Sequence, residues 1–93
     1  MTVPIELILC KARGFIDGYD RMNDTERGRF PSEAYANDYN SLRSMIQQNV
    51  PDLKELIPPQ AQMFPQPSNH QRLCMYHYSD LNVYCSQIAA LLS

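Results

Sequence analysis

Hydrophobic residues along this 93-residue chain recur at alternating spacings of three and four residues in three long segments. The first segment covers residues 4–23, and its apolar positions are Ile5, Ile8, Ala12, Phe15, Tyr19 and Met22. This period predicts an amphipathic α-helix with one continuous apolar face. Pro4 suits the first turn of such a helix, and Gly28 followed by Pro31 stops it.

The second segment covers residues 32–49 and begins at Ser32, a good N-cap residue. Its apolar positions are Tyr35, Tyr39, Leu42 and Ile46. Pro51 disfavours helical geometry in the residue before it, so the helix is expected to end near that point. Because proline is tolerated in a first turn, a short helix over residues 51–57 is predicted next, ended by the following proline pair.

The third segment covers residues 69–92 and has the most regular period in the chain. Its apolar positions are Cys74, Tyr78, Leu81, Cys85, Ile88 and Leu92. A helix over this whole range is the first prediction. The alternative is a strand over residues 73–78, because tyrosine-rich runs favour β structure, followed by a shorter helix capped by Ser79.

A connector of residues 58–67 joins the second and third segments. It holds four of the seven prolines and has no hydrophobic period, which favours an extended, polyproline-like conformation. Met63 and Phe64 are too apolar for a free linker, so we expect them to hold the connector against the helices. Together these elements predict an all-α single domain over residues 1–93. The expected architecture is a small up-down three-helix bundle with an additional short helix and a Pro-rich crossing segment.

The composition narrows the classes of function. With 44% hydrophobic and 19% charged residues, the chain is typical of a globular domain. The net charge of −2 gives no strong attraction to nucleic acid or to an anionic membrane, so neither partner is expected. None of the three glycines lies in a phosphate-binding loop motif, so nucleotide binding by those routes is not indicated.

The cysteine count bears on the cellular compartment. Three cysteines cannot all pair within the chain, and an odd count in one small domain is typical of a reduced, intracellular protein. The apolar run from Ile5 to Cys10 is interrupted by Glu6 and is too short for a signal peptide or a membrane span. We therefore expect a cytoplasmic protein.

A second apolar face is predicted on the third helix, opposite its main stripe. Tyr76, Val83 and Ala90 recur there at seven-residue spacing, with Met75 beside them. A helix that is apolar on two sides is either central in its domain or packed on another chain, and a three-helix bundle has no central helix. We therefore predict a protein partner or a homo-oligomer at this face. The alternative is internal cover by the short helix or the connector.

Gly14 and Gly18 lie one turn apart on the first predicted helix and face away from its stripe, with Leu7 on the same side. Each glycine costs about 1 kcal/mol relative to alanine inside a helix. Close approach of another backbone would explain both, and on this interpretation they join the predicted partner-binding residues. The alternative is that the helix tolerates the loss near a loose end.

His70, Cys74 and His77 would share one face of the predicted third helix. Imidazole and thiolate are preferred zinc ligands, so this spacing could hold a soft metal ion. A structural zinc site needs a fourth ligand, and the chain has no Cys-x-x-Cys pair to help supply it. The favoured interpretation is a half-buried cysteine near two histidines, with no bound metal and no cofactor.

Cys74, His77 and Asp80 also follow one another at three-residue intervals, in the order of nucleophile, base and orienting acid. A thiol in the middle of a helix has no unbonded backbone N–H groups nearby to form an oxyanion hole, so catalysis is not expected. Cys10 falls on the polar face of the first helix beside Arg13, where an exposed thiol could react or pair between chains. An incidental surface cysteine is the favoured interpretation there.

These patterns indicate a non-catalytic protein-interaction module. Such a helical adaptor, subunit or small regulator would self-associate or dock on a larger protein. The expected partner-binding residues are Tyr76, Val83, Ala90, Met75, Gly14 and Gly18. The alternative function is a small-molecule or metal-binding helical bundle built around His70, Cys74 and His77.

Overall fold

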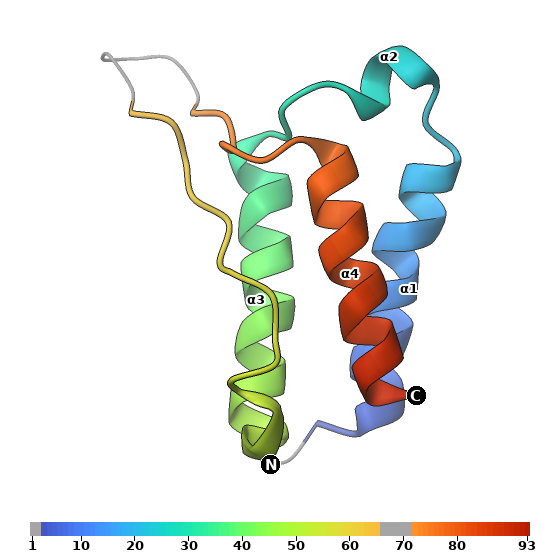
Figure 1. Cartoon of the computed structure of the whole chain (residues 1–93), viewed down its shortest axis with the longest axis vertical. Coiled ribbons are helices and arrows are strands. Elements are labelled where there is room, and N and C mark those ends of the chain that lie inside the picture. Colours follow the sequence, from blue (N-terminus) through green and yellow to red (C-terminus); the bar gives the residue numbers. More distant parts are fainter. Residues whose placement is uncertain (1–2, 66–71) are drawn as a thin grey trace.

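The computed structural model describes residues 3–65 and 72–93 (Figure 1). Its elements are α1 (Ile5–Asp20), α2 (Asp24–Arg27), α3 (Glu33–Asn49), the 3-10 turn η1 (Pro51–Leu53) and α4 (Tyr78–Leu92). Within these residues, β-type pairing is limited to two isolated bridges. The prediction of an all-α fold is therefore confirmed.

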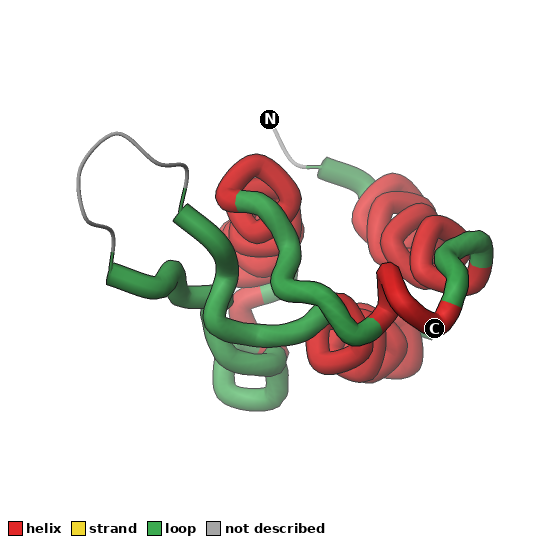
Figure 2. The backbone as a smooth tube through the Cα atoms, turned by 90° about the horizontal axis from the view of Figure 1, so that it is seen from above, coloured by secondary structure: helices red, strands yellow, loops and turns green. Residues whose placement is uncertain are grey.

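The three long helices lie side by side along the longest axis of the molecule. Seen from above, they occupy the corners of a triangle (Figure 2). α1 makes its most extensive helix contact with α4 and a smaller one with α3. α3 and α4 run in the same direction, and both are antiparallel to α1 (Figure 1). The expected up-down order is therefore wrong for the last helix, because the chain returns along the whole length of α3 before α4 begins.

The connector after η1 runs beside α3 in an extended conformation, in the opposite direction to that helix (Figure 1). A proline-rich backbone has few N–H donors, so its carbonyl groups need donors from elsewhere. Side chains of α3 supply them. Arg43 Nε donates to the carbonyl of Pro58 at 2.7 Å, and the Tyr39 hydroxyl donates to the carbonyl of Pro59 at 2.9 Å.

Asn40 continues this contact as a two-way bridge to the backbone of Ala61. Its Nδ2 donates to the Ala61 carbonyl at 3.0 Å, and its Oδ1 accepts the Ala61 N–H at 2.8 Å. Ala61 is buried, so these groups have little access to water. The connector is thus bound to α3 through its own backbone rather than only through apolar side chains.

The core lies between the three helices and the connector. Its buried hydrophobic residues are Ile8, Ala12, Ala36, Tyr39, Leu42, Ile46, Ala61, Cys74, Leu81, Cys85 and Ile88. Each predicted stripe contributes to this set. Among the residues that the structure describes, no polar or charged side chain is buried.

Two helix boundaries differ from the prediction. α4 begins at Tyr78 rather than at residue 69, with His77 at the N-cap position. The His77 N–H donates to Asp80 Oδ2 at 3.0 Å, which satisfies one backbone donor at the helix start. Residues 72–77 are not helical, whereas residues 69–71 lie outside the described residues. The alternative, a strand over residues 73–78 and a helix capped by Ser79, is right about the shorter helix, but this segment forms only isolated bridges and the cap residue is His77. The short helix expected over 51–57 is reduced to η1.

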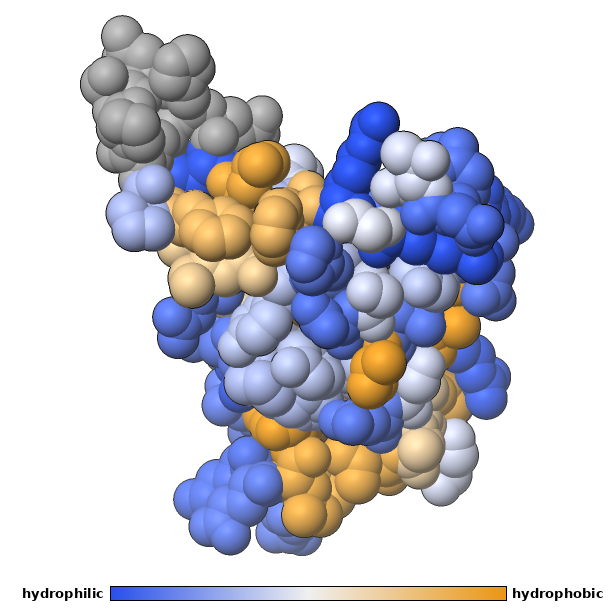
Figure 3. Space-filling model, turned by 45° about the horizontal axis from the view of Figure 1, so that its top comes forward, coloured by the Kyte–Doolittle hydropathy of each residue, from blue (hydrophilic) through white to orange (hydrophobic). Residues whose placement is uncertain are grey.

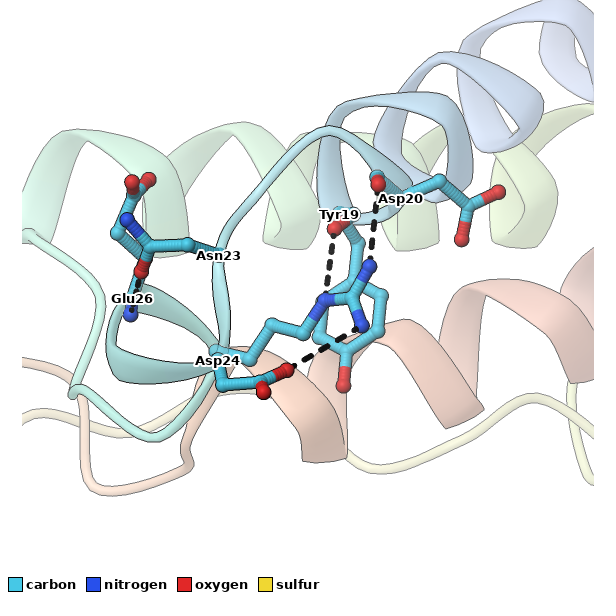
Figure 4. Close-up of polar contacts among 6 residues, drawn as sticks. Tyr19, Asp20, Asn23, Asp24 and Glu26 are labelled. Atoms are coloured by element: carbon cyan, nitrogen blue, oxygen red, sulfur yellow. Dashed lines mark hydrogen bonds and ion pairs between the residues drawn. The ribbon is translucent and has the colours of Figure 1, made fainter.

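A single helical turn, α2, follows α1 and was not predicted. Asn23 caps it by accepting the Glu26 N–H at 2.8 Å (Figure 4). Arg27 donates to the carbonyls of Tyr19 and Asp20 at 3.2 and 3.0 Å, and its guanidinium lies 4.8 Å from the centre of the Tyr19 ring. These carbonyls belong to the last turn of α1, where the regular helical hydrogen bonds stop; the Tyr19 carbonyl also accepts the Met22 N–H at 3.0 Å. Arg27 therefore stabilises the end of α1 and the sharp turn after it.

Candidate functional site

Three short extended segments lie side by side at the end of the molecule where α3 and α4 begin. The middle segment, residues 73–75, pairs with residues 62–64 on one side and with residues 31–32 on the other. Its hydrogen bonds are Phe64 N–H to Leu73 O (2.9 Å), Met75 N–H to Gln62 O (2.7 Å) and Cys74 N–H to Pro31 O (2.9 Å). This small layer covers one end of the core.

Side chains of an extended segment alternate between its two faces. Cys74 and Pro31 are buried on the inner face, and Met63 packs against the core. The outer face carries large hydrophobic side chains, whose exposed fractions are 37% for Phe30, 36% for Phe64, 45% for Leu73 and 45% for Met75. We call these four side chains the end patch. Figure 3 shows apolar side chains gathered at this end, beside the grey residues.

Aromatic contacts fix the end patch in place. The Phe30 and Phe64 rings meet edge to face, with centroids 5.0 Å apart. The other side of Phe30 stacks on the His77 ring at 4.2 Å. His77 is itself held by a hydrogen bond of 2.8 Å between Nδ1 and the carbonyl of Gly28. Such contacts limit the side-chain freedom that a binding event would otherwise have to remove.

The predicted face on the third helix is only partly formed. Met75 belongs to the end patch, whereas Tyr76 precedes α4, is half-buried and packs edge to face on Tyr84 at 5.6 Å. Val83 and Ala90 are exposed on α4. The helical neighbours of Val83 are all polar, namely Ser79, Asp80, Ser86 and Gln87. Because α4 starts after Tyr76, no continuous apolar stripe runs from Tyr76 to Ala90.

Gly14 and Gly18 line a groove between α1 and α3. The groove has a volume of about 490 Å³, and its lining includes Phe15, Leu42 and Met45. A Cβ atom added to either glycine would meet nothing within 4 Å, leaving aside the backbone of α1 itself. A close approach of another backbone within the described chain therefore does not explain these glycines.

Cys74 and His77 precede α4, so they do not lie on one helix face as the predicted metal site required. Cys74 is buried, and its sulfur accepts the Tyr76 N–H at 3.4 Å. The His77 ring stacks on Phe30, and its Nδ1 forms a hydrogen bond with the Gly28 carbonyl. His70 lies outside the described residues. Among the residues that the structure describes, no group of three or more histidine, cysteine or acidic side chains could hold a metal ion.

The series Cys74, His77 and Asp80 does not form a nucleophile–base–acid chain. The Asp80 carboxylate accepts the backbone N–H of His77, whereas the His77 ring bonds to the Gly28 carbonyl. Burial raises the pKa of the Cys74 thiol, which disfavours the reactive thiolate. Cys10 is exposed.

The Cys85 thiol and the phenol groups of Tyr35 and Tyr39, which the core shields from water, make the stability depend on pH in the alkaline range. Burial raises the pKa of Cys85 to about 12 and raises the pKa values of Tyr35 and Tyr39 well above the usual range for tyrosine. In the unfolded chain these groups ionise near pH 8.5 and about pH 10. The unfolded chain releases these protons first, so these three groups leave the free energy of unfolding unchanged at neutral pH. It should then fall as the pH rises from about 9 towards 12.

Urea unfolding at a series of pH values would measure this fall. A Tyr39→Phe variant has one ionising group fewer, so its stability should fall less steeply above about pH 10. A Cys10→Ala variant, changed at an exposed thiol, should follow the wild-type curve. A free energy of unfolding that stays level up to about pH 11 would contradict the expected effect of burial.

Sequence reasoning missed Phe30, Leu73 and the outward direction of Phe64. Met63 and Phe64 were expected to hold the connector against the helices, and Met63 does pack on the core. Phe64 instead packs on Phe30 at the surface. The signal for the end patch is a period of two over residues 73–75, and three residues are too few to distinguish it from the helical period of the segment that follows.

Comparison of the chain with protein-family models, curated proteins and solved structures finds no match. Within the described ranges, no helix has both the length and the apolar character needed to cross a membrane.

Proposed function

We propose that this chain is a non-catalytic protein-interaction module that binds a protein partner through the end patch. The observation that carries this proposal is the convergence of Phe30, Phe64, Leu73 and Met75 on one exposed surface. Covering apolar surface gains about 25 cal/mol for each Å² removed from water. A cluster of this kind on a small domain marks a surface that gains from being covered.

The partner chemistry follows from the patch and its border. Phenylalanine and methionine are enriched at the centres of protein interfaces, where charged side chains are depleted. Arg72, which precedes the patch residue Leu73, is paired with Glu33, since its Nε lies 2.7 Å from Glu33 Oε2. The patch therefore fits apolar or aromatic side chains of another protein, with the Arg72–Glu33 pair at the polar rim.

The rest of the molecule supports a binding role without catalysis. Neither Cys74 nor His77 is placed for nucleophilic or acid–base chemistry, as described above. Three unpaired cysteines support a reducing, cytoplasmic location for the module.

A paired substitution tests this function. The double variant Phe64→Ser/Leu73→Ser should lower the amount of partner retained from an extract of the source cells at least tenfold, because central apolar contacts dominate interface energies. The matched control is Leu56→Ser, which changes the most exposed large hydrophobic residue of the described chain outside the patch. The control should retain the partner as the wild type does. Equal loss in both variants, or in neither, would contradict the proposal.

A further inference from the structure

The His77 ring borders the end patch and is held by two contacts. It stacks on Phe30 with ring centroids 4.2 Å apart and an angle of 23° between the ring planes. Phe30 also meets Phe64 edge to face, so Phe30 contacts both rings. Nδ1 of His77 lies 2.8 Å from the Gly28 carbonyl oxygen. These contacts give the imidazole a fixed orientation beside the patch.

The hydrogen bond to Gly28 decides which ring nitrogen carries the proton. A carbonyl oxygen can only accept, so Nδ1 must donate, and Nε2 of the uncharged ring is then an acceptor. Among the described residues, no donor is bonded to Nε2, and Asn82 Oδ1 is the only buried side-chain N or O atom without a partner. His77 Nε2 is therefore open to water at the border of the patch.

Backbone donors of the extended layer are already used. The N–H groups of Phe64, Cys74 and Met75 are all bonded within the layer. The end patch thus combines apolar side chains with an acceptor on His77. A partner that covers this surface removes water from Nε2, and a covered acceptor left unpaired weakens binding by about tenfold.

From this combination we infer that the end patch binds a tryptophan side chain of the partner protein, whose indole N–H donates to His77 Nε2. The inference rests on the proposed function, because it names the partner chemistry of the same surface. Indole joins a large apolar body to one donor and has no acceptor. A tyrosine hydroxyl or a side-chain amide also brings an acceptor, which the bonded N–H groups of the layer cannot pair.

Two small compounds that differ only in the indole donor test this hydrogen bond. They are N-acetyl-tryptophan amide and its analogue methylated at the indole nitrogen. In NMR titrations that follow the methyl groups of Leu73 and Met75, the first compound should bind about tenfold more tightly than the second. Leu56→Ser, which lies outside the patch, should keep this difference.

Two substitutions separate Nε2 from the rest of His77. In His77→Asn the amide N–H can still donate to the Gly28 carbonyl, and asparagine is a favourable N-cap residue, but nothing replaces Nε2. This variant should bind both compounds equally and keep a melting temperature close to that of the wild type. His77→Gln has a longer side chain whose amide oxygen can serve as the acceptor, so it should recover part of the difference.

Acidification gives a result that a purely structural role of His77 would not produce. A second proton converts Nε2 into a donor, so the preference for the N–H compound should disappear between about pH 8 and about pH 5. The titratable and charged groups beside the ring are Asp80 and Tyr78 of α4, and Arg29 between Gly28 and Phe30. His77→Gln keeps these groups, so its preference should not change over the same pH range.

Three results would overturn this inference. They are equal binding of the two compounds to the wild type near pH 8, a preference that persists in His77→Asn, and binding of neither compound at the patch. The first two still show an apolar ligand on the patch and leave the proposed function standing. The proposed function is measured with the partner itself through Phe64→Ser/Leu73→Ser, so its failure is recognised separately.

Discussion

Leu81→Ala is expected to lower the free energy of unfolding by about 2–5 kcal/mol. Leu81 is fully buried at the centre of the α4 stripe, and its removal leaves a cavity that the surrounding helices fill only in part. Ile88→Ala, one stripe position beyond Cys85, should cost a similar amount because Ile88 is equally buried. Urea denaturation measures both losses.

Val83→Ala is the matched control, since it shortens an aliphatic side chain on the same helix at an exposed position. Its cost should stay within about 0.5 kcal/mol. A loss below about 1 kcal/mol at both Leu81 and Ile88 would mean that α4 does not face the core as described.

Asn40→Ala is expected to cost about 2–4 kcal/mol, although Asn40 is a polar residue on a helix surface. The substitution leaves both the N–H and the carbonyl of Ala61 without their partners. Ala61 is buried, and each buried group left unsatisfied costs about 1–3 kcal/mol. The expected result is therefore a loss comparable to that of a core truncation.

Two variants check this interpretation in the same denaturation experiment. Asn40→Asp keeps the acceptor for the Ala61 N–H but loses the donor, so its cost should be intermediate at neutral pH. Asn37→Ala changes an exposed asparagine on the same helix and should have little effect. If Asn40→Ala and Asn37→Ala cost the same, the side chain of Asn40 does not hold the connector.

The helices were predictable because their signals are local. The stripe of α3 places Tyr39, Leu42 and Ile46 in the core, as a period of 3.6 residues requires. Ser32 caps α3 by accepting the Tyr35 N–H at 3.3 Å. These features depend on residues within one or two turns of each other, so a sequence pattern contains them.

The direction and start of α4 depend on contacts between distant segments. The regular spacing of Cys74 and Tyr78 continues the helical period, yet Cys74 is drawn into pairing with Met63 and Pro31. Those hydrogen bonds, together with the hydrogen bond from the His77 N–H to Asp80, set the start of α4 at Tyr78. The segments that pair with Cys74 lie more than ten positions away in the sequence. The hydrophobic period alone does not contain these contacts, so it predicted a helix that starts too early.

The two candidate surfaces also differ in whether local sequence signals could predict them. Gly14 and Gly18 stood out from the sequence because glycine is costly inside a helix, and they line the groove. The end patch joins residues from three segments, and of its four residues only Met75 was predicted to bind a partner. The patch forms because short extended segments pair with one another. Segments of three residues are too short to show a distinct hydrophobic period.

Site-specific photo-cross-linking at the end patch tests the proposed function most directly. A benzophenone amino acid replaces Phe64, and the chain is illuminated in the cells that produce it. The result expected is a discrete adduct with a protein partner, lost when Leu73→Ser is added and absent when the same cross-linker replaces Leu56. No adduct from position 64, or equal adducts from positions 64 and 56, would contradict a partner-binding role for the end patch.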